Sequence, residues 1–391
     1  MEYCSNCVYP FVSAVPASFD DSGVCSGCKV SGQKNEIDWA SRLQALRDLI
    51  LKNRNPESGY DCIIPVSGGK DSYFQTHLIT KILGFKPLLI TYHGNNFMEE
   101  GTRNLNRMRE VFDVDHIIFK PSETVLKKLN RLAFKMMGDM NWHNHVGIYT
   151  YPAIMAVKYN IPVMIWGEHG RTEVGGMYNL NDFIEMTKKY VLEHASRGFT
   201  WEDMIEESEG LKENDLSFLK YPTDDELFDL EIRGLHLSNF VKWSPNENTK
   251  LIQKLYNWDG AGKSFDRTYR VMSNLDDMHE NGVHDYLKFI KFGYGRATDH
   301  ACKDIRSGEF DREKGVKMVE KYDHVKPSDI QRWLTYVDMS EEEFDKIADT
   351  FRDSRVWWID KELWWKDSLH GSPKSYGKVS LDKSLWTKYL R

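Results

Sequence analysis

Short apolar runs alternate with amphipathic stretches between residue 36 and about residue 210. Four of these runs have the continuous hydrophobic character of strands buried on both faces: YDCIIPV, KPLLITY, HIIFK and IPVMIWG. Helical patterns separate them, such as the run EIDWASRLQALRDLILKN and the spacing of Phe74, Leu78 and Ile82. Buried strands that alternate with helices predict an α/β fold with a parallel sheet and helices on both faces.

Two flanking regions have a different character. Residues 1–35 are rich in cysteine, glycine and serine. This region is too short to form a stable hydrophobic core without a cross-link or a bound metal ion. Residues 211–391 are acidic and aromatic, with long polar helical runs and few strand patterns. We therefore expect three regions: a small N-terminal module (1–35), the α/β domain (36–210) and a mainly helical C-terminal region (211–391). The segment 369–380 is expected to be a loop.

Composition narrows the class of protein. The chain has 391 residues and a formal net charge of −7, which disfavours a general nucleic-acid binder but leaves room for a local basic patch. No apolar run approaches the length that crosses a bilayer, and the start MEYCSNCVYP lacks the features of a signal peptide. We expect a cytoplasmic protein without membrane insertion, whose cysteines are reduced.

The N-terminal module carries two C-x2-C pairs. Each pair can sit on a tight knuckle and supply two thiolates to one tetrahedral ion, and four thiolates with no open position make a structural site. The spacing predicts a zinc ribbon with zinc bound by Cys4, Cys7, Cys25 and Cys28. An iron–sulfur cluster, or free or redox-active cysteines, are the alternatives.

A glycine-rich loop follows the first predicted strand. In CIIPVSGGKDS, the backbone N–H groups of Ser67, Gly68 and Gly69 can turn toward an anion, and the helix that begins near Asp71 directs its positive end to the same place. Lys70 and Ser72 add a charge and a hydroxyl. The alternative is a plain strand–turn–helix junction, which two glycines alone would suggest. A second stretch, NWDGAGKS at 257–264, ends like a Walker loop, but it follows a helical run and is interpreted as a turn whose basic neighbours Lys263 and Arg267 could line a substrate site.

The stretch PVSGGKDS resembles the PP-loop ATP pyrophosphatases, which have the adenine-nucleotide α-hydrolase-like fold. This resemblance implies that ATP is cleaved between its α and β phosphates while a substrate oxygen is adenylated. It also implies Mg²⁺ held by Asp71 together with Glu168 or Glu173, for which solvated loop carboxylates are the alternative. The residues implied in catalysis are Lys70, Asp71 and Glu168, and those implied in ATP binding are Ser67, Gly68, Gly69, Lys70, Asp71, Ser72, Tyr92 and His93.

Three further stretches refine the resemblance: YCSNCVYP, WGEHGRTEVGG and KFGYGRATDHACKDIRSG. With the loop, they resemble the N-acetyl sugar amidotransferases of bacterial surface-glycan synthesis, the WbpG/PseA-like family of lipopolysaccharide and flagellin-sugar pathways. The resemblance implies conversion of an acetamido group on a sugar or nucleotide sugar to an acetamidino group. Adenylation would make the amide oxygen a leaving group that ammonia displaces. The candidate substrate residues are Asn95, Asn96, His143, His145, Glu168, His169, Arg171, Arg296, Asp299 and His300. For most of them, a polar residue that is satisfied at the surface or in the core is the alternative.

Two other classes remain open. A tRNA-thiolating PP-loop enzyme also often carries cysteine pairs, but the acidic charge and the aromatic C-terminal region argue against it. A non-catalytic scaffold is disfavoured by the intact SGGKDS loop.

The nitrogen source is expected to be external. Four cysteines are assigned to metal, Cys62 lies in a predicted buried strand, and Cys302 stands only two residues after His300, a spacing that does not bring two side chains together on a helix. The chain is therefore not expected to hydrolyse glutamine alone. The family resemblance implies a HisH-like glutaminase and a HisF-like ammonia channel as partners.

Overall fold

The computed structural model describes all residues except 1, 208–209, 274, 276–277 and 391. Five parallel strands form the main sheet, in the order β3-β2-β1-β4-β5. Their bounds are β1 Cys62–Pro65, β2 Pro87–Tyr92, β3 His116–Phe119, β4 Val163–Trp166 and β5 Arg233–His236. The expected parallel sheet is confirmed. Its fifth strand lies beyond residue 210, in the part of the chain that was expected to be mainly helical.

Alternate strand residues face two different hydrophobic cores. Ile64 lies in a core with residues of the helices α2 (Trp39–Asn53), α3 (Lys70–His77), α4 (Glu99–Phe112) and α11 (Pro245–Tyr256). Its neighbour Ile63 lies in a second core with residues of α6 (Trp142–Tyr159). Successive side chains of a strand point to opposite faces, so helices cover both faces of the sheet.

The order of the strands places a switch point between β1 and β4. From β1 the chain moves outward through β2 to β3, and then returns to the other side of β1 as β4. Loops that leave the carboxyl ends of two such strands diverge and open a crevice, where open α/β sheets bind their ligands. The loop that begins at Ser67 and the segment that begins at Gly167 follow these two strands.

Most remaining elements are helical. Between the strands lie α5 (Glu123–Met137), α7 (Gly170–Gly175), α8 (Lys188–Tyr190), α9 (Trp201–Glu206) and α10 (Asp224–Leu230), and a π-helical turn at Leu78–Ile82 continues α3. The C-terminal region adds α12 (Met278–Phe292), α13 (Arg296–Arg306), α14 (Arg312–Tyr322), α15 (Ile330–Val337) and α16 (Glu341–Thr350). No helix in the described ranges is long and apolar enough to cross a membrane.

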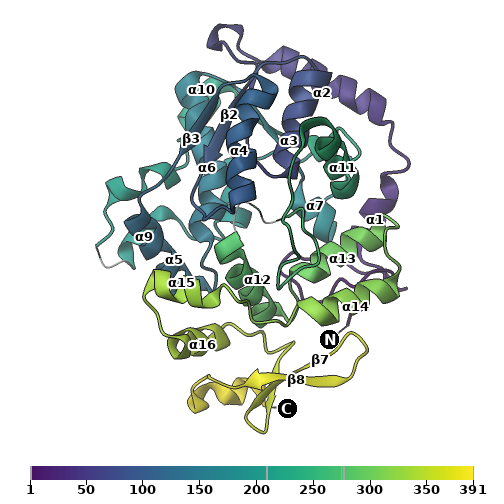
Figure 1. The fold of residues 1–391 in the computed structure, drawn as a ribbon, viewed down its shortest axis with the longest axis vertical. Helices are drawn as coiled ribbons and strands as arrows, with labels where there is room; N and C mark the ends of the chain where they lie inside the picture. The colour runs from purple at the N-terminus through teal and green to yellow at the C-terminus, as the bar shows by residue number, and fades with distance from the viewer. Residues whose placement is uncertain (1, 208–209, 274, 276–277, 391) are drawn as a thin grey trace.

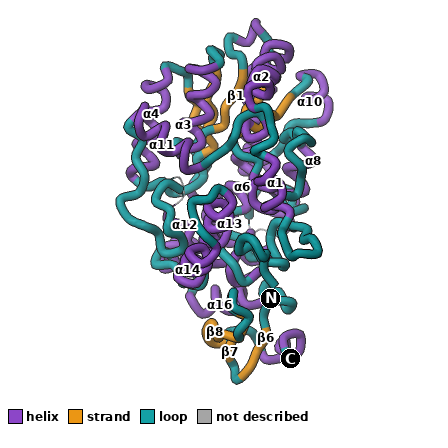
Figure 2. Tube along the Cα trace, turned by 90° about the vertical axis from the view of Figure 1, so that its right-hand side faces the viewer, coloured by secondary structure: helices purple, strands orange, loops and turns teal. Residues whose placement is uncertain are grey.

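A small antiparallel sheet closes the C-terminal end. It pairs β6 (Trp358–Asp360), β7 (Leu363–Asp367) and β8 (Pro373–Lys378). The expectation of a loop at 369–380 was therefore wrong for β8, whose polar, mostly exposed residues carry no alternating pattern. Figures 1 and 2 place this sheet and the main sheet at opposite ends of the molecule.

The N-terminal module is held on the C-terminal region. It contains α1 (Ser26–Gln33), which packs against α7 and α13 (Figure 1). Cys4, Cys7 and Cys25 share a core with Ala301 and Cys302 of α13. The module therefore joins elements that lie far apart in the sequence, and it stands next to the segment that follows β4.

Candidate active site

The glycine loop is fixed by close contacts that only glycine allows. Gly68 has φ +79°, and a Cβ at this position would lie 2.6 Å from Cα of Leu105 in α4. The Gly68 carbonyl accepts a hydrogen bond of 3.0 Å from Nε1 of Trp258. The Ser67 backbone N–H donates to Oγ of Ser72 at 2.9 Å. The loop is thus held from both sides, with the first turn of α3 at its end.

The stretch 257–264, which resembled a Walker loop, supports this glycine loop from outside. It is irregular and begins at Asn257, which ends α11 in the left-handed conformation with φ 50°, and it follows a helix rather than a strand. Lys263 is exposed and Arg267 is 1% exposed, donating to backbone carbonyls that include that of Asp323. Neither residue lines the cavity at the loop. Only Trp258 reaches the loop, through its hydrogen bond to Gly68.

A cavity of about 240 Å³ opens at the carboxyl ends of β1 and β4. The loop contributes Ser67, Gly69, Lys70 and Asp71, and the segment after β4 contributes Glu168. The C-terminal region contributes the rest of the wall: Pro245, Arg270, Met272, Ser273, Leu275, Arg296, His300 and Lys303. The structure therefore brings loop residues together with residues that lie far later in the chain.

Positive charge dominates this cavity. Four cationic side chains line it: Lys70, Arg270, Arg296 and Lys303. Two carboxylates, Asp71 and Glu168, also line it, which leaves a formal excess of two positive charges. Arg270 is paired with Asp304 and Arg296 with Asp285, two carboxylates outside the cavity. A cationic cavity at a helix N-terminus after a glycine loop is suited to bind phosphate groups.

The two carboxylates in the cavity are each held by a lysine. Asp71 accepts from Nζ of Lys70 at 2.5 Å, while its Oδ1 is buried and has no partner among the described residues. Glu168 is paired with Lys303. Burial alone would raise the pKa of Glu168, but the positive charges of Lys303, Lys70 and Lys34 outweigh it, so the pKa is lowered and the carboxylate is ionised at neutral pH.

His300 is a neutral imidazole in a cationic environment. Burial is the largest cause that lowers its pKa well below the usual value, and the charges of Arg270, Arg296, Lys303 and Lys70 act in the same direction. Its Nδ1 lies 2.6 Å from Oγ1 of Thr268. The ring is therefore held in place and is neutral at neutral pH.

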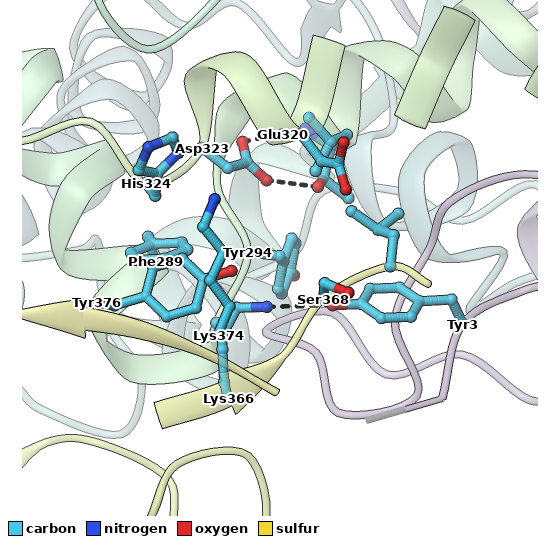
Figure 3. A pocket seen from close by; sticks show the side chains of 14 residues that line it. Tyr3, Phe289, Tyr294, Glu320, Asp323, His324, Lys366, Ser368, Lys374 and Tyr376 are labelled. Carbon is cyan, nitrogen blue, oxygen red and sulfur yellow. Dashed lines mark hydrogen bonds between the residues drawn. The ribbon is translucent and has the colours of Figure 1, made fainter. Parts of the chain in front are cut away.

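The helix α13 carries three of the side chains that line the cavity: Arg296, His300 and Lys303. The start of α13 is held by the buried carboxylate of Asp323, which follows the last residue of α14. Asp323 accepts hydrogen bonds from the Gly295 N–H at 2.8 Å and from Oγ1 of Thr298 at 2.5 Å. Asp323 lines a small cavity together with Lys366 and Tyr3 (Figure 3). The volume of this cavity is about 30 Å³. This cavity has room for about one water molecule, so it belongs to the support of α13 rather than to a substrate site.

Most of the predicted substrate residues lie away from the cavity. Only Glu168, Arg296 and His300 line it. Asp299 is paired with Lys288 at 2.5 Å, and Arg171 donates to the carbonyl of His194 at 3.1 Å. His169 is 1% exposed and accepts from the Thr172 N–H at the start of α7.

A second group of predicted residues lies near the carboxyl end of β2. Tyr92 and His143 form a buried hydrogen bond of 3.1 Å, and His93 stacks on Phe97 with ring centroids 4.1 Å apart. His145 faces Asp139, and burial lowers its pKa to about 3. None of these, nor Asn95 and Asn96, lines the cavity at the glycine loop. Tyr92 is the last residue of β2, the strand next to β1 in the sheet, and His93 follows it.

Glu173 lines a different cavity, which it shares with Glu168. It is paired with Lys34 of the N-terminal module at 2.6 Å, and burial is the main reason that its pKa is raised. It does not line the cavity at the loop. Of the three predicted magnesium ligands, Asp71 and Glu168 therefore share a cavity, and Glu173 is separated from it.

The cysteine quartet is assembled as predicted. The four Sγ atoms of Cys4, Cys7, Cys25 and Cys28 lie within 4.8 Å of one another, with 3.9 Å between Cys4 and Cys28 and 3.7 Å between Cys7 and Cys25. Tetrahedral zinc with bonds of about 2.3 Å places its sulfur ligands roughly 3.8 Å apart. The cluster could hold a zinc ion, and it is the only group of three or more such ligands within the described ranges.

Residues 260–369 match a family model described as LPS biosynthesis protein WbpG-like, C-terminal domain. This part of the chain is similar to that C-terminal domain, and residues 260–369 are called the WbpG-like domain from this point on. No curated protein matches the chain. The WbpG-like domain contains the stretch KFGYGRATDHACKDIRSG, and it supplies Arg270, Arg296, His300 and Lys303 to the cavity.

Sequence reasoning missed two cations of the WbpG-like domain that line the cavity. Lys303 follows His300 by three positions on α13, a spacing that puts both on one helix face, so the helix period could have identified it. Arg270 lies in the irregular stretch FDRTYRVM, where no period places a side chain. Only the folded structure shows that it lines the cavity.

Proposed function

We propose that the chain is an ATP-dependent amidotransferase of the WbpG/PseA type, which converts the acetamido group of a sugar or nucleotide sugar to an acetamidino group in bacterial surface-glycan synthesis. One observation carries this proposal. The cavity at the carboxyl ends of β1 and β4 combines the SGGKDS loop with Arg296, His300 and Lys303 of the WbpG-like domain. The loop suits ATP, and the domain suits the pathway that the family description gives.

The charges of the cavity support a reaction at phosphate. In this proposal, the acceptor's amide oxygen attacks the α-phosphorus of ATP and pyrophosphate leaves. The loop N–H groups, Lys70, Arg296 and Lys303 would stabilise the negative charge of the departing pyrophosphate, which is the kind of fixed electrostatic contact that gives large rate effects. The adenylated oxygen then leaves as AMP when ammonia attacks the amide carbon, and the product is an amidine.

A magnesium ion would fit between the loop and the segment after β4. Asp71 has a buried oxygen, Oδ1, without a partner among the described residues, and the ionised Glu168 lines the same cavity. Hard oxygen ligands of this kind are the ones that Mg²⁺ prefers. When bound there, the ion would neutralise phosphate charge. Lys70 and Lys303, which hold these carboxylates, would then turn toward the nucleotide.

His300 is the best candidate for moving a proton. Ammonia that attacks carbon becomes a charged ammonium group and must lose a proton before AMP departs. The neutral imidazole of His300 lines the cavity, and the negative phosphates of bound ATP would offset the cations that lower its pKa and so strengthen it as a base.

The ammonia would come from partner proteins. Cys302 is 0% exposed and packs in the core of the N-terminal module, so it is not placed as a glutaminase nucleophile. We therefore include a HisH-like glutaminase and a HisF-like ammonia channel in the proposal, together with a cytoplasmic location where free thiols persist.

The decisive experiment is product analysis with an Asp71→Asn variant. The full chain is incubated with ATP, Mg²⁺, ammonium and an N-acetylated nucleotide sugar, and the nucleotide products are separated. We expect AMP and pyrophosphate, and a loss of about 10²-fold or more in rate for Asp71→Asn, because a preorganised contact to the phosphates is removed.

The matched control is Asp225→Asn, which changes an exposed carboxylate in the first turn of α10. It should retain the rate of the unmodified chain. ADP and phosphate as the products would refute the proposal, and so would an unchanged rate in Asp71→Asn. Formation of AMP that depends on tRNA instead of the sugar would favour a tRNA-thiolating enzyme.

A further inference from the structure

A second, larger cavity adjoins the one at the glycine loop. It has a volume of about 520 Å³ and shares Glu168, Pro245, Arg270 and Lys303 with its neighbour. Its other walls come from α1 of the N-terminal module, from α7, from the start of α11 and from the end of α13, which Figure 1 shows grouped around one region. The two cavities thus meet at the Glu168–Lys303 ion pair.

The two cavities differ in charge. The cavity at the loop has an excess of two cations, as described above. The larger cavity has equal numbers of basic and acidic side chains, so its formal charge is zero. The five basic residues are Lys34, Lys242, Arg270, Lys303 and Arg306, and the five acidic residues are Glu168, Glu173, Glu247, Asp304 and Glu309. Three of these carboxylates are already paired inside the structure, with Lys303, Lys34 and Arg270. Phosphate is therefore favoured at the loop, and the larger cavity is suited to a ligand without net charge.

The larger cavity is rich in groups that form hydrogen bonds. Amides and hydroxyls of Asn35, Asn246, Ser31, Ser244 and Ser307 line it. Trp243 also lines it and is 3% exposed, and its Nε1 has no partner within the described part of the chain. Glu173 Oε1 is likewise buried without a partner there. Both atoms are enclosed in the cavity wall, and unpaired buried groups are costly, so a ligand with an acceptor and a donor would be stabilised if it paired with them.

We propose that the larger cavity is the acceptor subsite and that it binds the uncharged, polyhydroxylated ring of the N-acetylated sugar. The identity of the acceptor rests on the function proposed above, whereas the position of the subsite rests on the charge and hydrogen-bonding groups of the two cavities. The acetamido group then lies at the Glu168–Lys303 boundary, next to the α-phosphate, and the ring lies between α1 and the start of α11.

This placement gives the N-terminal module a second role as a wall of the subsite. Arg306 donates to the carbonyls of Glu173 and Val174 at 3.0 and 2.8 Å, and to Sγ of Cys25 at 3.3 Å. A Cβ on Gly27 of α1 would lie 2.4 Å from the Arg306 guanidinium. The cysteine cluster, α1 and α7 are therefore fixed to one another through a single side chain at the cavity.

The test blocks the cavity after the protein has folded. A Ser307→Cys variant is purified and labelled with pyrene maleimide, so that the same preparation is compared with and without the label. Ser307 is exposed and lines the cavity, while Cys62 and Cys302 are buried. Saturation-transfer NMR then measures binding of N-acetylglucosamine and N-acetylgalactosamine, each free and UDP-linked. Affinity for α,β-methylene-ATP is measured in parallel.

We expect at least one free sugar to receive saturation through its N-acetyl and ring protons, and the label on Ser307→Cys to reduce the effect about tenfold or more. The affinity for the ATP analogue should be unchanged by the label. A labelled Ser375→Cys chain, altered at an exposed position of β8 outside both cavities, should bind sugar like the unlabelled chain.

Absence of transfer to all four probes in the unmodified chain would overturn the proposal, and so would transfer that persists after Ser307→Cys is labelled. These outcomes are independent of the chemistry at ATP. If the sugar binds as expected but ATP yields ADP, the subsite stands and the proposed amidotransferase reaction fails. If AMP and pyrophosphate form but the label does not affect sugar binding, the subsite alone is wrong.

Discussion

At the scale of single residues, glycine and charge could be recognised in the sequence, whereas three-dimensional proximity could not. The SGGKDS sequence predicted an anion-binding loop, because the backbone can approach an anion closely only where glycine follows the buried strand. His143 and Arg171 were chosen by the same kind of reasoning, and the structure places them in hydrogen bonds away from the cavity. A polar side chain near a motif in sequence has many possible partners, and only packing selects among them.

Gly68→Ala is the sharpest test at this scale. The added Cβ would meet the backbone of Leu105 at 2.6 Å, and φ of +79° is unfavourable for alanine. Backbone strain of this kind costs roughly 1–3 kcal/mol, and the steric contact adds to it. We expect a lower free energy of unfolding in urea and a loss of affinity for α,β-methylene-ATP, measured by calorimetry.

Gly59→Ala provides the matched control. Gly59 has the same φ of +79°, but no heavy atom lies within 4 Å of the position of its Cβ. It should lower stability by the strain alone and retain nucleotide affinity. Equal effects of the two substitutions on nucleotide affinity would mean that the contact with α4 does not shape the loop.

At the scale of elements, continuous apolar runs identified the four strands that precede residue 210. The fifth strand was missed because its sequence, RGLH, is short and only half apolar, and its pairing with β4 rather than its pattern defines it. The same holds for β8, where PKSYGK pairs with β7 although its residues are mostly exposed. Edge strands with solvent contact carry little hydrophobic signal.

The helix α13 depends on a cap that comes from another element. Asp323→Ala would leave the Gly295 N–H and both hydrogen-bonding groups of Thr298 without their carboxylate. Loss of hydrogen bonds to a buried charged group costs roughly 1.5–3 kcal/mol each when counted singly, although such values are not additive. We expect a decrease of several kcal/mol in the free energy of unfolding, and a higher KM for ATP because Arg296 and Lys303 lose their fixed positions.

Asp311→Ala is the corresponding local control. Asp311 caps α14 through the Lys314 N–H at 2.7 Å and is exposed. Its removal should cost about 1 kcal/mol, as is usual for helix N-caps, and leave KM unchanged. If Asp323→Ala behaves like Asp311→Ala in both measurements, the buried carboxylate does not hold α13 in place.

At the scale of the whole molecule, the cysteine quartet predicted a metal-binding module but not where the module would dock. Its spacing was informative because tetrahedral coordination restricts how the pairs can lie. The contact with α7 and α13 depends on side chains such as Arg306, whose hydrogen bonds span 281 positions to Cys25. Contacts at such separation have no local pattern, so the wall that the module gives to the larger cavity could be found only in the structure.

Metal content tests this arrangement through a pair of cysteine variants. The double variant Cys25→Ser, Cys28→Ser removes two of the four thiolates, so zinc should fall from about one ion per chain to nearly none by mass spectrometry. Structural zinc contributes an apparent binding free energy of roughly 10–16 kcal/mol in small zinc-finger peptides. We therefore expect the module to loosen and the melting temperature of the full chain to fall, because Arg306 loses thiolate partners at the point where α1, α7 and α13 meet.

Cys302→Ser is the control, since Cys302 is buried in the same core but does not belong to the quartet. It should keep its zinc, and a chain that loses zinc in Cys302→Ser but retains it in the double variant would show that the ligands have been wrongly assigned.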